Sequence, residues 1–238
     1  MTRMLASVRT LDEGLQALHG GADLIDLKEP SRGALGALDH AAVRICVRAI
    51  SGRAPVSATI GDLPAMDPPR IAAATDAMAA TGVDFIKIGF FARPRALECA
   101  QALASRGAGT KLIAVLFAEE SYDPGLVDAL ARSGFAGAML DTAQKAGGSL
   151  RTLRSDDELH AFVDHCHACG LLAGLAGSLA QDDVVPLLNL VPDYLGFRGA
   201  LCRNGERGRR LDAAAFAVIR AAIPRNASAA RTQAAVAA

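Results

Sequence analysis

Short apolar runs rich in β-branched residues alternate with alanine- and leucine-rich stretches of helical periodicity along nearly the whole chain. Eight of these runs have the length and composition of buried strands. They lie at residues 4–9, 24–29, 56–61, 85–90, 111–118, 137–143, 172–177 and 194–200. The stretches between and after them predict helices at residues 11–19, 41–50, 69–80, 94–105, 125–133, 156–168, 181–189 and 211–222.

This alternation predicts the fold class. Strands that are joined by helices pair in parallel through right-handed crossovers. Eight such repeats in 238 residues suit an α/β protein with a single closed (β/α)8 barrel better than an open doubly wound sheet. We expect one barrel domain over residues 1–222 and a disordered tail over residues 223–238, because the apolar periodicity ends there.

Charge and cysteine content exclude several classes of partner. The 25 basic and 25 acidic residues balance, so no global field draws the chain to nucleic acid or to a membrane surface. The five cysteines are scattered, and the chain shows neither a secretory leader nor an apolar run long enough to span a membrane. These features predict a cytoplasmic protein.

Lysine is rare in this chain and its placement is informative. Only four of the 25 basic residues are lysines, and three of them, Lys28, Lys87 and Lys145, lie at or just after the ends of predicted strands. Catalytic groups of such barrels belong at the carboxyl ends of the strands, so Lys111, which begins its strand, is expected at the opposite end. A lysine can form an imine or lose its proton near neutral pH, which an arginine cannot do.

The two-residue period of a strand predicts which side chains meet inside the barrel. Asp26 and Lys28 share one face of their strand, and Lys87 is expected on the inner face of its own strand beside Gly89. Buried charges need partners, so we expect Asp26, Lys28, Lys87 and Asp141 to form a network at the mouth of the barrel.

Two neighbouring lysines predict covalent chemistry. Repulsion between two cations and partial burial both favour the neutral amine of one of them, and a neutral amine is a nucleophile. The second lysine and Asp141 are then candidates for proton transfer, which imine formation requires. The alternative interpretation is that each lysine only makes a salt bridge that closes the barrel.

A second group of residues predicts phosphate binding. The loops after the last two strands carry Gly177, Ser178, Arg198 and Gly199, and in such barrels these loops commonly hold a phosphate. Glycines allow backbone amides to approach an anion, Ser178 can donate a hydrogen bond, and Arg198 can clamp the anion. Two alternatives stay open: the glycines form only tight turns, or Arg198 is buried among the inner charges of the barrel.

Two other segments resemble binding sites. The residues His165, Cys166, His167 and Cys169 include metal-ligating types, but they end a helix at the far end of the barrel and lack a zinc spacing pattern. We therefore expect them to be structural, with no metal and no cofactor. The arginine-rich stretch 203–210 is expected to form a loop that reaches a phosphorylated substrate or stays solvated, rather than a nucleic-acid patch.

Several motifs taken together resemble one family. They are Asp26-Leu-Lys-Glu-Pro30 with Gly33-Ala-Leu-Gly36, Val56-Ser-Ala-Thr-Ile-Gly-Asp62, Asp84-Phe-Ile-Lys-Ile-Gly89, Met139-Leu-Asp-Thr-Ala-Gln-Lys145, Ala176-Gly-Ser-Leu179 and Gly196-Phe-Arg-Gly-Ala-Leu-Cys202. Over residues 4–221 the chain resembles the (5-formylfuran-3-yl)methyl phosphate synthases of methanofuran biosynthesis.

This resemblance implies a lyase with an aldolase-like barrel that condenses two molecules of glyceraldehyde 3-phosphate and releases phosphate and water. It implies that Lys28 forms the Schiff base, Lys87 accepts a proton, and Asp141 with Lys145 supplies further acid and base groups. Asp26 is grouped with the substrate-binding residues. Another Schiff-base aldolase or isomerase of sugar phosphates, or a non-catalytic sugar-phosphate sensor, is the alternative. The expected partner is a phosphorylated triose, and association into a homo-oligomer stays open.

Overall fold

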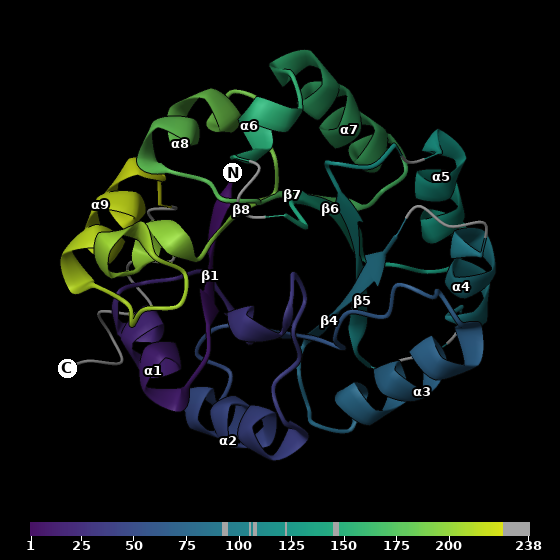
Figure 1. Cartoon of the computed structure of the whole chain (residues 1–238), viewed down its shortest axis with the longest axis horizontal. Helices are drawn as coiled ribbons and strands as arrows, with labels where there is room; N and C mark the ends of the chain where they lie inside the picture. The colour runs from purple at the N-terminus through teal and green to yellow at the C-terminus, as the bar shows by residue number, and fades with distance from the viewer. Residues whose placement is uncertain (92–94, 105, 107–108, 122, 145–147, 226–238) are drawn as a thin grey trace.

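Eight parallel strands close into a barrel in this computed structural model (Figure 1). The structure describes all residues except 92–94, 105, 107–108, 122, 145–147 and 226–238. Neighbouring strands pair in chain order, and β8 pairs with β1. The strands are β1 (Arg3–Val8), β2 (Leu24–Leu27), β3 (Val56–Thr59), β4 (Phe85–Phe90), β5 (Lys111–Phe117), β6 (Gly137–Asp141), β7 (Leu172–Leu175) and β8 (Tyr194–Phe197). The predicted fold class is confirmed.

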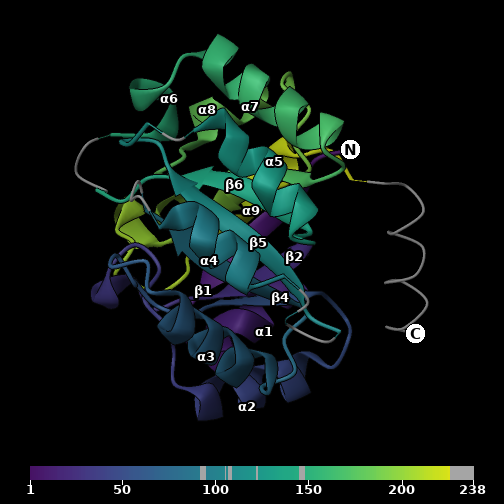
Figure 2. The same cartoon turned by 90° about the vertical axis from the view of Figure 1, so that its right-hand side faces the viewer.

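Helices form a ring around this barrel, as Figures 1 and 2 show from two directions. They are α1 (Leu11–His19), α2 (His40–Ile50), α3 (Pro68–Ala79), α4 (Ala96–Ala102), α5 (Pro124–Arg132), α6 (Leu150–Leu153), α7 (Asp156–Ala168), α8 (Gln181–Leu188) and α9 (Ala213–Ala222). Short 3-10 helices lie at Pro30–Arg32, Gly199–Leu201 and Arg203–Gly205. Within the described residues, no helix has the length and apolarity that crossing a membrane requires.

The elements follow the expected pattern with instructive differences. The strand at residues 85–90 and the helices at 11–19 and 156–168 have the predicted bounds. Several other strands stop two or three residues early, because the chain turns into loops at their carboxyl ends. The one-turn helix α6 was not predicted, since four residues are too few to show a helical period. The predicted tail falls largely on residues 226–238, which lie outside the described residues.

Two apolar layers hold the barrel together. Residues that point outward from the strands, among them Ile25, Leu27, Ile86 and Ile88, pack against the helices. The inward residues form a second cluster that fills the barrel, and these include Leu5, Leu24, Phe85, Val115, Met139 and Tyr194. The predicted alternation of inward and outward side chains is therefore confirmed for β2 and β4.

The lower interior of the barrel is closely packed around a glycine. A Cβ atom on Gly174 would collide with the ring of Tyr194, so only glycine allows this ring to lie across the barrel. The phenol is 2% exposed, and burial raises its pKa far above the usual value. The aromatic ring thus forms part of the floor under the charged residues.

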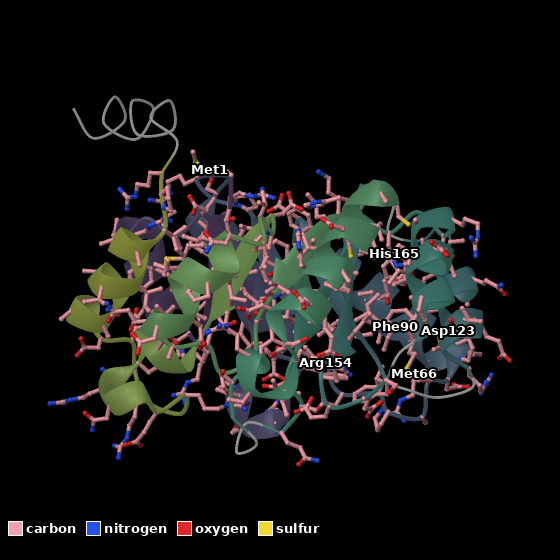
Figure 3. The ribbon with its side chains drawn as sticks, turned by 90° about the horizontal axis from the view of Figure 1, so that it is seen from above. Met1, Met66, Phe90, Asp123, Arg154 and His165 are labelled. Carbon is pink, nitrogen blue, oxygen red and sulfur yellow. The ribbon has the colours of Figure 1, made fainter. Side chains whose placement is uncertain are left out.

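The two ends of the barrel are distinguished by the direction of α7. Ser155 caps its start and pairs reciprocally with Glu158 in a capping box. Figure 3 shows Met1 and His165 toward one end of the molecule and Met66 and Arg154 toward the other. Met1 precedes β1 and so marks the amino end of the strands. Because Arg154 lies just before α7 and His165 near its end, α7 starts at the carboxyl end of the strands and runs to their amino end.

Candidate active site

Four charged side chains meet inside the carboxyl end of the barrel. The Nζ atom of Lys87 lies 3.0 Å from Oδ1 of Asp26, and Nζ of Lys28 lies 3.5 Å from Oδ2 of Asp141. All four residues are buried, with exposed fractions between 0% and 9%. The predicted network is therefore present as two neighbouring ion pairs.

Asp26 is the most enclosed member of the network. The strand register places Ser7 and Ser57 at its level on the two adjacent strands, and their hydroxyls donate to its carboxylate over 2.8 and 2.6 Å. Burial raises the pKa of Asp26. The charges of Lys87 and Lys28 and the hydrogen bond from Ser57 lower it by more than burial raises it, so the net pKa lies below the ordinary 3.8. Asp26 remains an anion and orients Lys87.

Lys87 is held where its charge is costly. Burial lowers the pKa of its amine, Asp26 opposes this effect, and the nearby charge of Lys28 lowers the pKa again; the net value lies below 10.5. The register places Lys87 beside Thr59, the last residue of β3, so it lies level with a strand end although it is the third residue of β4. This lysine is suited to accept and return a proton.

The loop after β2 reaches the inner face of β4 at Gly89, two residues beyond Lys87. The backbone amides of Ala34 and Leu35 donate to the carboxylate of Asp62 over 3.1 and 2.9 Å. Leu35 is thereby held above Gly89, where a Cβ atom would approach Leu35 Cδ1 within 2.7 Å. This leucine therefore fills the space that the missing side chain of Gly89 leaves on the inner face of β4.

A cavity of about 580 Å³ opens above the network. Lys28, Lys87 and Asp141 line its lower part, and the loops after β7 and β8 line its rim. Gly177 and Ser178 have φ angles of 112° and 48°, and a Cβ atom at Gly177 would collide with Thr142. The predicted glycine loops therefore border the same space as the lysines. Asp26 lies behind Lys87, outside the lining.

Lys145 is the one predicted catalytic residue that the structure does not place, because it lies outside the described residues. The loop before it is anchored: Glu119 accepts hydrogen bonds from the backbone amides of Ala143 and Gln144 over 3.0 and 2.8 Å. The catalytic role predicted for Lys145 stays a prediction.

The guanidinium of Arg198, which the sequence offered as a clamp for the phosphate, is already hydrogen-bonded within the protein. Its Nη1 and Nη2 atoms bond the carboxylate of Glu13 at 2.7 and 3.3 Å, and the remaining hydrogens go to carbonyl oxygens of Ser7, Arg207 and Arg209. These five hydrogen bonds use the whole donor capacity of a guanidinium. The side chain of Arg198 is therefore largely buried, as in one alternative left open by the sequence, but its charged partner is Glu13 of α1 and not the network inside the barrel.

Sequence reasoning did not single out Arg207, which also lines the cavity. Its Nη2 atom donates to the carbonyl oxygens of Pro30 and Gly33 over 2.6 and 3.0 Å. The arginine-rich stretch contains several equivalent candidates, and only the path of the folded loop distinguishes this one.

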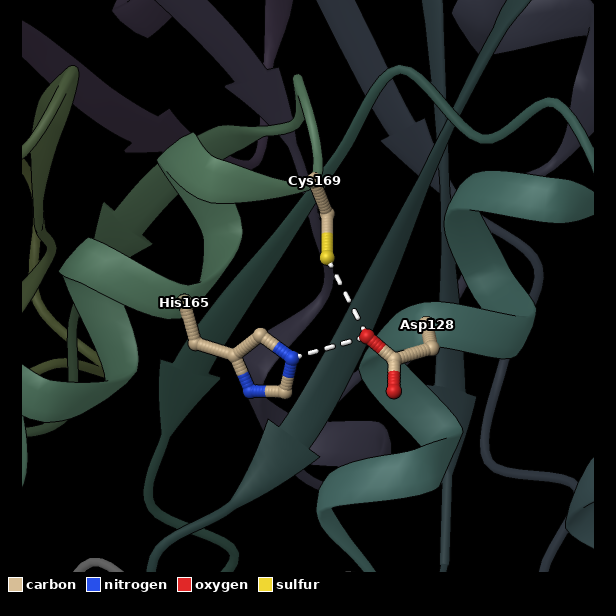
Figure 4. Close-up of side chains that lie close together, drawn as sticks. All are labelled: Asp128, His165 and Cys169. Carbon is tan, nitrogen blue, oxygen red and sulfur yellow. Dashed lines mark hydrogen bonds and ion pairs between the residues drawn. The ribbon is translucent and has the colours of Figure 1, made fainter.

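The histidine and cysteine residues in the last turn of α7, with Cys169 just after it, lie at the amino end of the barrel. His165 Nε2 and Cys169 Sγ lie 2.9 and 3.3 Å from Oδ1 of Asp128 on α5, as Figure 4 shows. The three ligand atoms lie within 4.8 Å of one another, which a metal ion could use, but Asp128 already satisfies both partners. Cys166 is buried and His167 Nε2 pairs with Asp193 at 3.0 Å. Their structural role stays a prediction.

The arrangement at the mouth is suited to carbonyl chemistry. Lys28 borders the cavity with a carboxylate beside it, while a second lysine with a lowered pKa lies deeper. An amine of this kind can form an imine, and its neighbours can move the protons that imine formation and α-carbon chemistry require.

Comparisons with known proteins identify close relatives. The profile of the family described as 4-HFC-P synthase matches residues 4–220. A (5-formylfuran-3-yl)methyl phosphate synthase from Methanopyrus kandleri is 37% identical over 87% of this chain and 92% of its own. A Methylorubrum extorquens protein whose name assigns it provisionally to the same activity is 49% identical over 90% of this chain and 89% of its own.

The solved structures share the fold at low sequence identity. Phosphoribosyl anthranilate isomerase from Thermus thermophilus superposes with a TM-score of 0.65 at 17% identity, covering 93% of this chain and 98% of its own. This similarity concerns the barrel alone.

Proposed function

Because this chain belongs to the 4-HFC-P synthase family, we propose that it condenses two molecules of glyceraldehyde 3-phosphate into (5-formylfuran-3-yl)methyl phosphate through an imine on Lys28. The observation that carries the proposal is the paired network, in which Lys28 borders the cavity beside Asp141 while Lys87 is buried against Asp26. The product is inferred from the names of the relatives, and the network contains the amine and carboxylate groups that this reaction needs.

The choice of Lys28 as the nucleophile follows from access. Lys28 is 9% exposed and reaches the cavity next to an acid, whereas Lys87 is 3% exposed and is held at 3.0 Å by Asp26. A carbonyl carbon in the cavity therefore meets Lys28 first. The Lys28 amine adds to the aldehyde of the first triose, and water leaves to give the protonated imine, with Asp141 as the proton carrier.

The imine then permits loss of phosphate. Lys87 removes the proton on C2, because the positive imine nitrogen accepts the electron pair of the broken C–H bond as an enamine forms. The enamine returns this pair and expels the phosphate from C3, which leaves a conjugated imine with an electrophilic C3. One phosphate is thereby released without an oxidant, a reductant or a metal ion entering the balance.

The second triose supplies the other half of the ring. Its C2, deprotonated next to its own aldehyde, bonds to C3 of the first unit; the C2 oxygen of the first unit then closes onto the second aldehyde. Loss of two waters makes the ring aromatic, and hydrolysis of the imine frees Lys28 and the formyl group. Six carbons and one phosphate remain, as the product requires. The family resemblance adds Lys145 as a further acid or base.

The glycine loops after β7 and β8 support a phosphorylated substrate. Gly177, Ser178 and Gly199 line the cavity, where backbone amides can approach an anion. The alternative, another Schiff-base aldolase or isomerase acting on a sugar phosphate, uses the same lysines and differs only in the product.

One experiment tests both the product and the nucleophile. The protein is incubated with glyceraldehyde 3-phosphate alone, and the mixture is examined by ultraviolet absorption and mass spectrometry. We expect a furan chromophore and a product of the corresponding mass. Borohydride reduction during turnover should attach the triose to Lys28. A product without a furan contradicts the proposed reaction, and an adduct confined to Lys87 contradicts the assigned nucleophile.

A further inference from the structure

We propose that Arg207 is the cation through which this cavity recognises the phosphate of its substrate. The inference extends the proposed function by assigning the anion-binding side chain, and it rests on that function only in taking a phosphorylated substrate. It gives the role expected of Arg198 to a residue nine positions later, on the loop of residues 203–210, which we call the strap.

The strap is fixed over the mouth by two other arginines. Arg198 donates to the carbonyl oxygens of Arg207 and Arg209 over 2.9 and 2.8 Å, and Arg9 donates to that of Gly208 over 2.9 Å. The bridge between Cys202 and Leu211 closes the base of the strap. The strap residues other than Arg207 are exposed, but these hydrogen bonds anchor the backbone that carries Arg207.

The side chain of Arg207 crosses from the loop after β8 to the loop after β2. Both hydrogens of its Nη2 are used by the carbonyl oxygens of Pro30 and Gly33. Its Nε and Nη1 atoms have no hydrogen-bond acceptor among the described residues. A guanidinium carries five N–H donors, so three remain for a ligand. Because Arg207 lines the cavity with Lys28, these donors can reach an anion there.

The charge of Arg207 requires compensation that the protein only partly provides. The residue is partly buried, and burial lowers the pKa of its guanidinium. The charges of Asp141, Asp62 and Glu29 oppose this effect and that of Arg198 adds to it, and the net pKa lies below its ordinary value. Asp141 is already paired with Lys28 at 3.5 Å. A phosphate in the cavity adds the missing negative charge and forms charge-assisted hydrogen bonds, which are the strong ones.

The competing interpretation is that Arg207 is only a tether between two loops. Its bonds to Pro30 and Gly33 would then explain its position without any ligand. The two interpretations differ for a substrate that lacks phosphate: a tether affects every substrate equally, whereas a phosphate ligand affects only the phosphorylated one.

Binding of glycerol 3-phosphate tests the recognition directly. This compound has no carbonyl group and forms no imine, so its affinity, measured by calorimetry, is independent of turnover. We expect Arg207→Gln to weaken its binding about 10- to 100-fold, the loss expected for hydrogen bonds to a charged group. Arg203→Gln, an exposed residue of the same strap, should change the affinity less than about twofold. Unchanged binding by Arg207→Gln overturns the proposal.

Borohydride trapping on Lys28 separates recognition from tethering. Arg207→Gln should slow adduct formation with glyceraldehyde 3-phosphate and leave that with unphosphorylated glyceraldehyde unchanged. An equal slowing of both overturns the proposal. Arg207→Lys, which keeps the charge, should recover part of the preference for the phosphorylated substrate. If the glutamine variant does not fold, the same two trapping rates are compared between Arg207→Lys and the wild type. A wild-type protein that makes no furan, yet binds glycerol 3-phosphate through Arg207, contradicts the proposed reaction and not this site.

Discussion

At the carboxyl end of the barrel the side chains of Lys87 and Asp26 are 4% and 0% exposed, whereas at the amino end those of His165 and Asp128 are 31% and 44% exposed. Both ends gather groups that can carry protons or bind ions. At the amino end water screens each charge, so the groups orient one another and contribute little to the free energy of unfolding. At the mouth the charges depend on one another, because water is largely excluded.

The difference shows that residue type alone does not identify reactive groups. The amino end has the histidine and cysteine residues that usually suggest a metal site, whereas the buried network at the mouth is built from lysines and aspartates with two serines. Burial in the second set lowers the pKa of the Lys87 amine, so this amine loses its proton more readily than an exposed lysine does. The following predictions compare the two ends, from the largest effect to the smallest.

The largest effect is expected for Lys28→Arg compared with Lys111→Arg. An arginine keeps the positive charge at the mouth but cannot form an imine, so kcat should fall at least about ten-thousand-fold. Lys111 begins β5 at the amino end, with its Nζ 5.5 Å from the ring centre of Phe85, and its replacement should leave kcat unchanged. Steady-state product formation measures both. Substantial activity in Lys28→Arg would place the imine elsewhere.

The next effect concerns stability. Asp26→Asn removes the anion that pairs with Lys87 and accepts bonds from Ser7 and Ser57, and the uncompensated lysine should cost about 3–5 kcal/mol in the free energy of unfolding. Asp128→Asn at the amino end should leave this free energy unchanged within error, because solvent replaces the lost interactions. Denaturant titration compares the two variants. Equal losses at both ends would remove the distinction drawn from burial.

A smaller effect is expected in the pH dependence of the rate. Lys87 accepts a proton only as the neutral amine, and its pKa lies below 10.5, so kcat should fall about tenfold per pH unit below that lowered pKa. Asp26 raises the pKa of Lys87. Any residual activity of Asp26→Asn should therefore have its acidic limb at a lower pH than the wild type. A shift toward higher pH would mean that Lys87 is not the base.

The smallest effect is expected for Cys169→Ser. The sulfur lies 3.3 Å from Asp128 and a serine hydroxyl can donate to the same oxygen, so kcat and the thermal midpoint should not change measurably. Equimolar zinc should likewise leave the wild-type midpoint unchanged. A rise with zinc that Cys169→Ser abolishes would show that the amino-end cluster binds a metal ion.

The sequence predicted what depends on local periodicity. The strands at the mouth and the inward direction of Asp26 and Lys87 followed from a two-residue period and from the cost of burying an unpaired charge. Contacts between distant segments could not be predicted in this way. Arg198 looked free because Glu13, its partner, lies 185 residues away, and Asp128 lies 37 residues from His165.

The same limit applies to the support of the network. Ser7 and Ser57 become partners of Asp26 only through the register of three adjacent strands. A single sequence contains no information on register that would pair these serines with that carboxylate. The fold class and the central charges were therefore predictable, whereas the residues that hold them were not.

The tyrosine ring across Gly174 gives the barrel a closed floor. Together with Leu5 and Phe85 it fills the interior below the lysines, so the described residues leave the mouth as the entrance for both substrate and water. A bound triose then isolates Lys87 from the bulk solvent during turnover. Neither C2 carries hydrogen in the furan, so a proton that Lys87 takes returns to carbon only when that step reverses. Substrate recovered after partial turnover in heavy water should therefore carry less deuterium at C2 than free exchange would give.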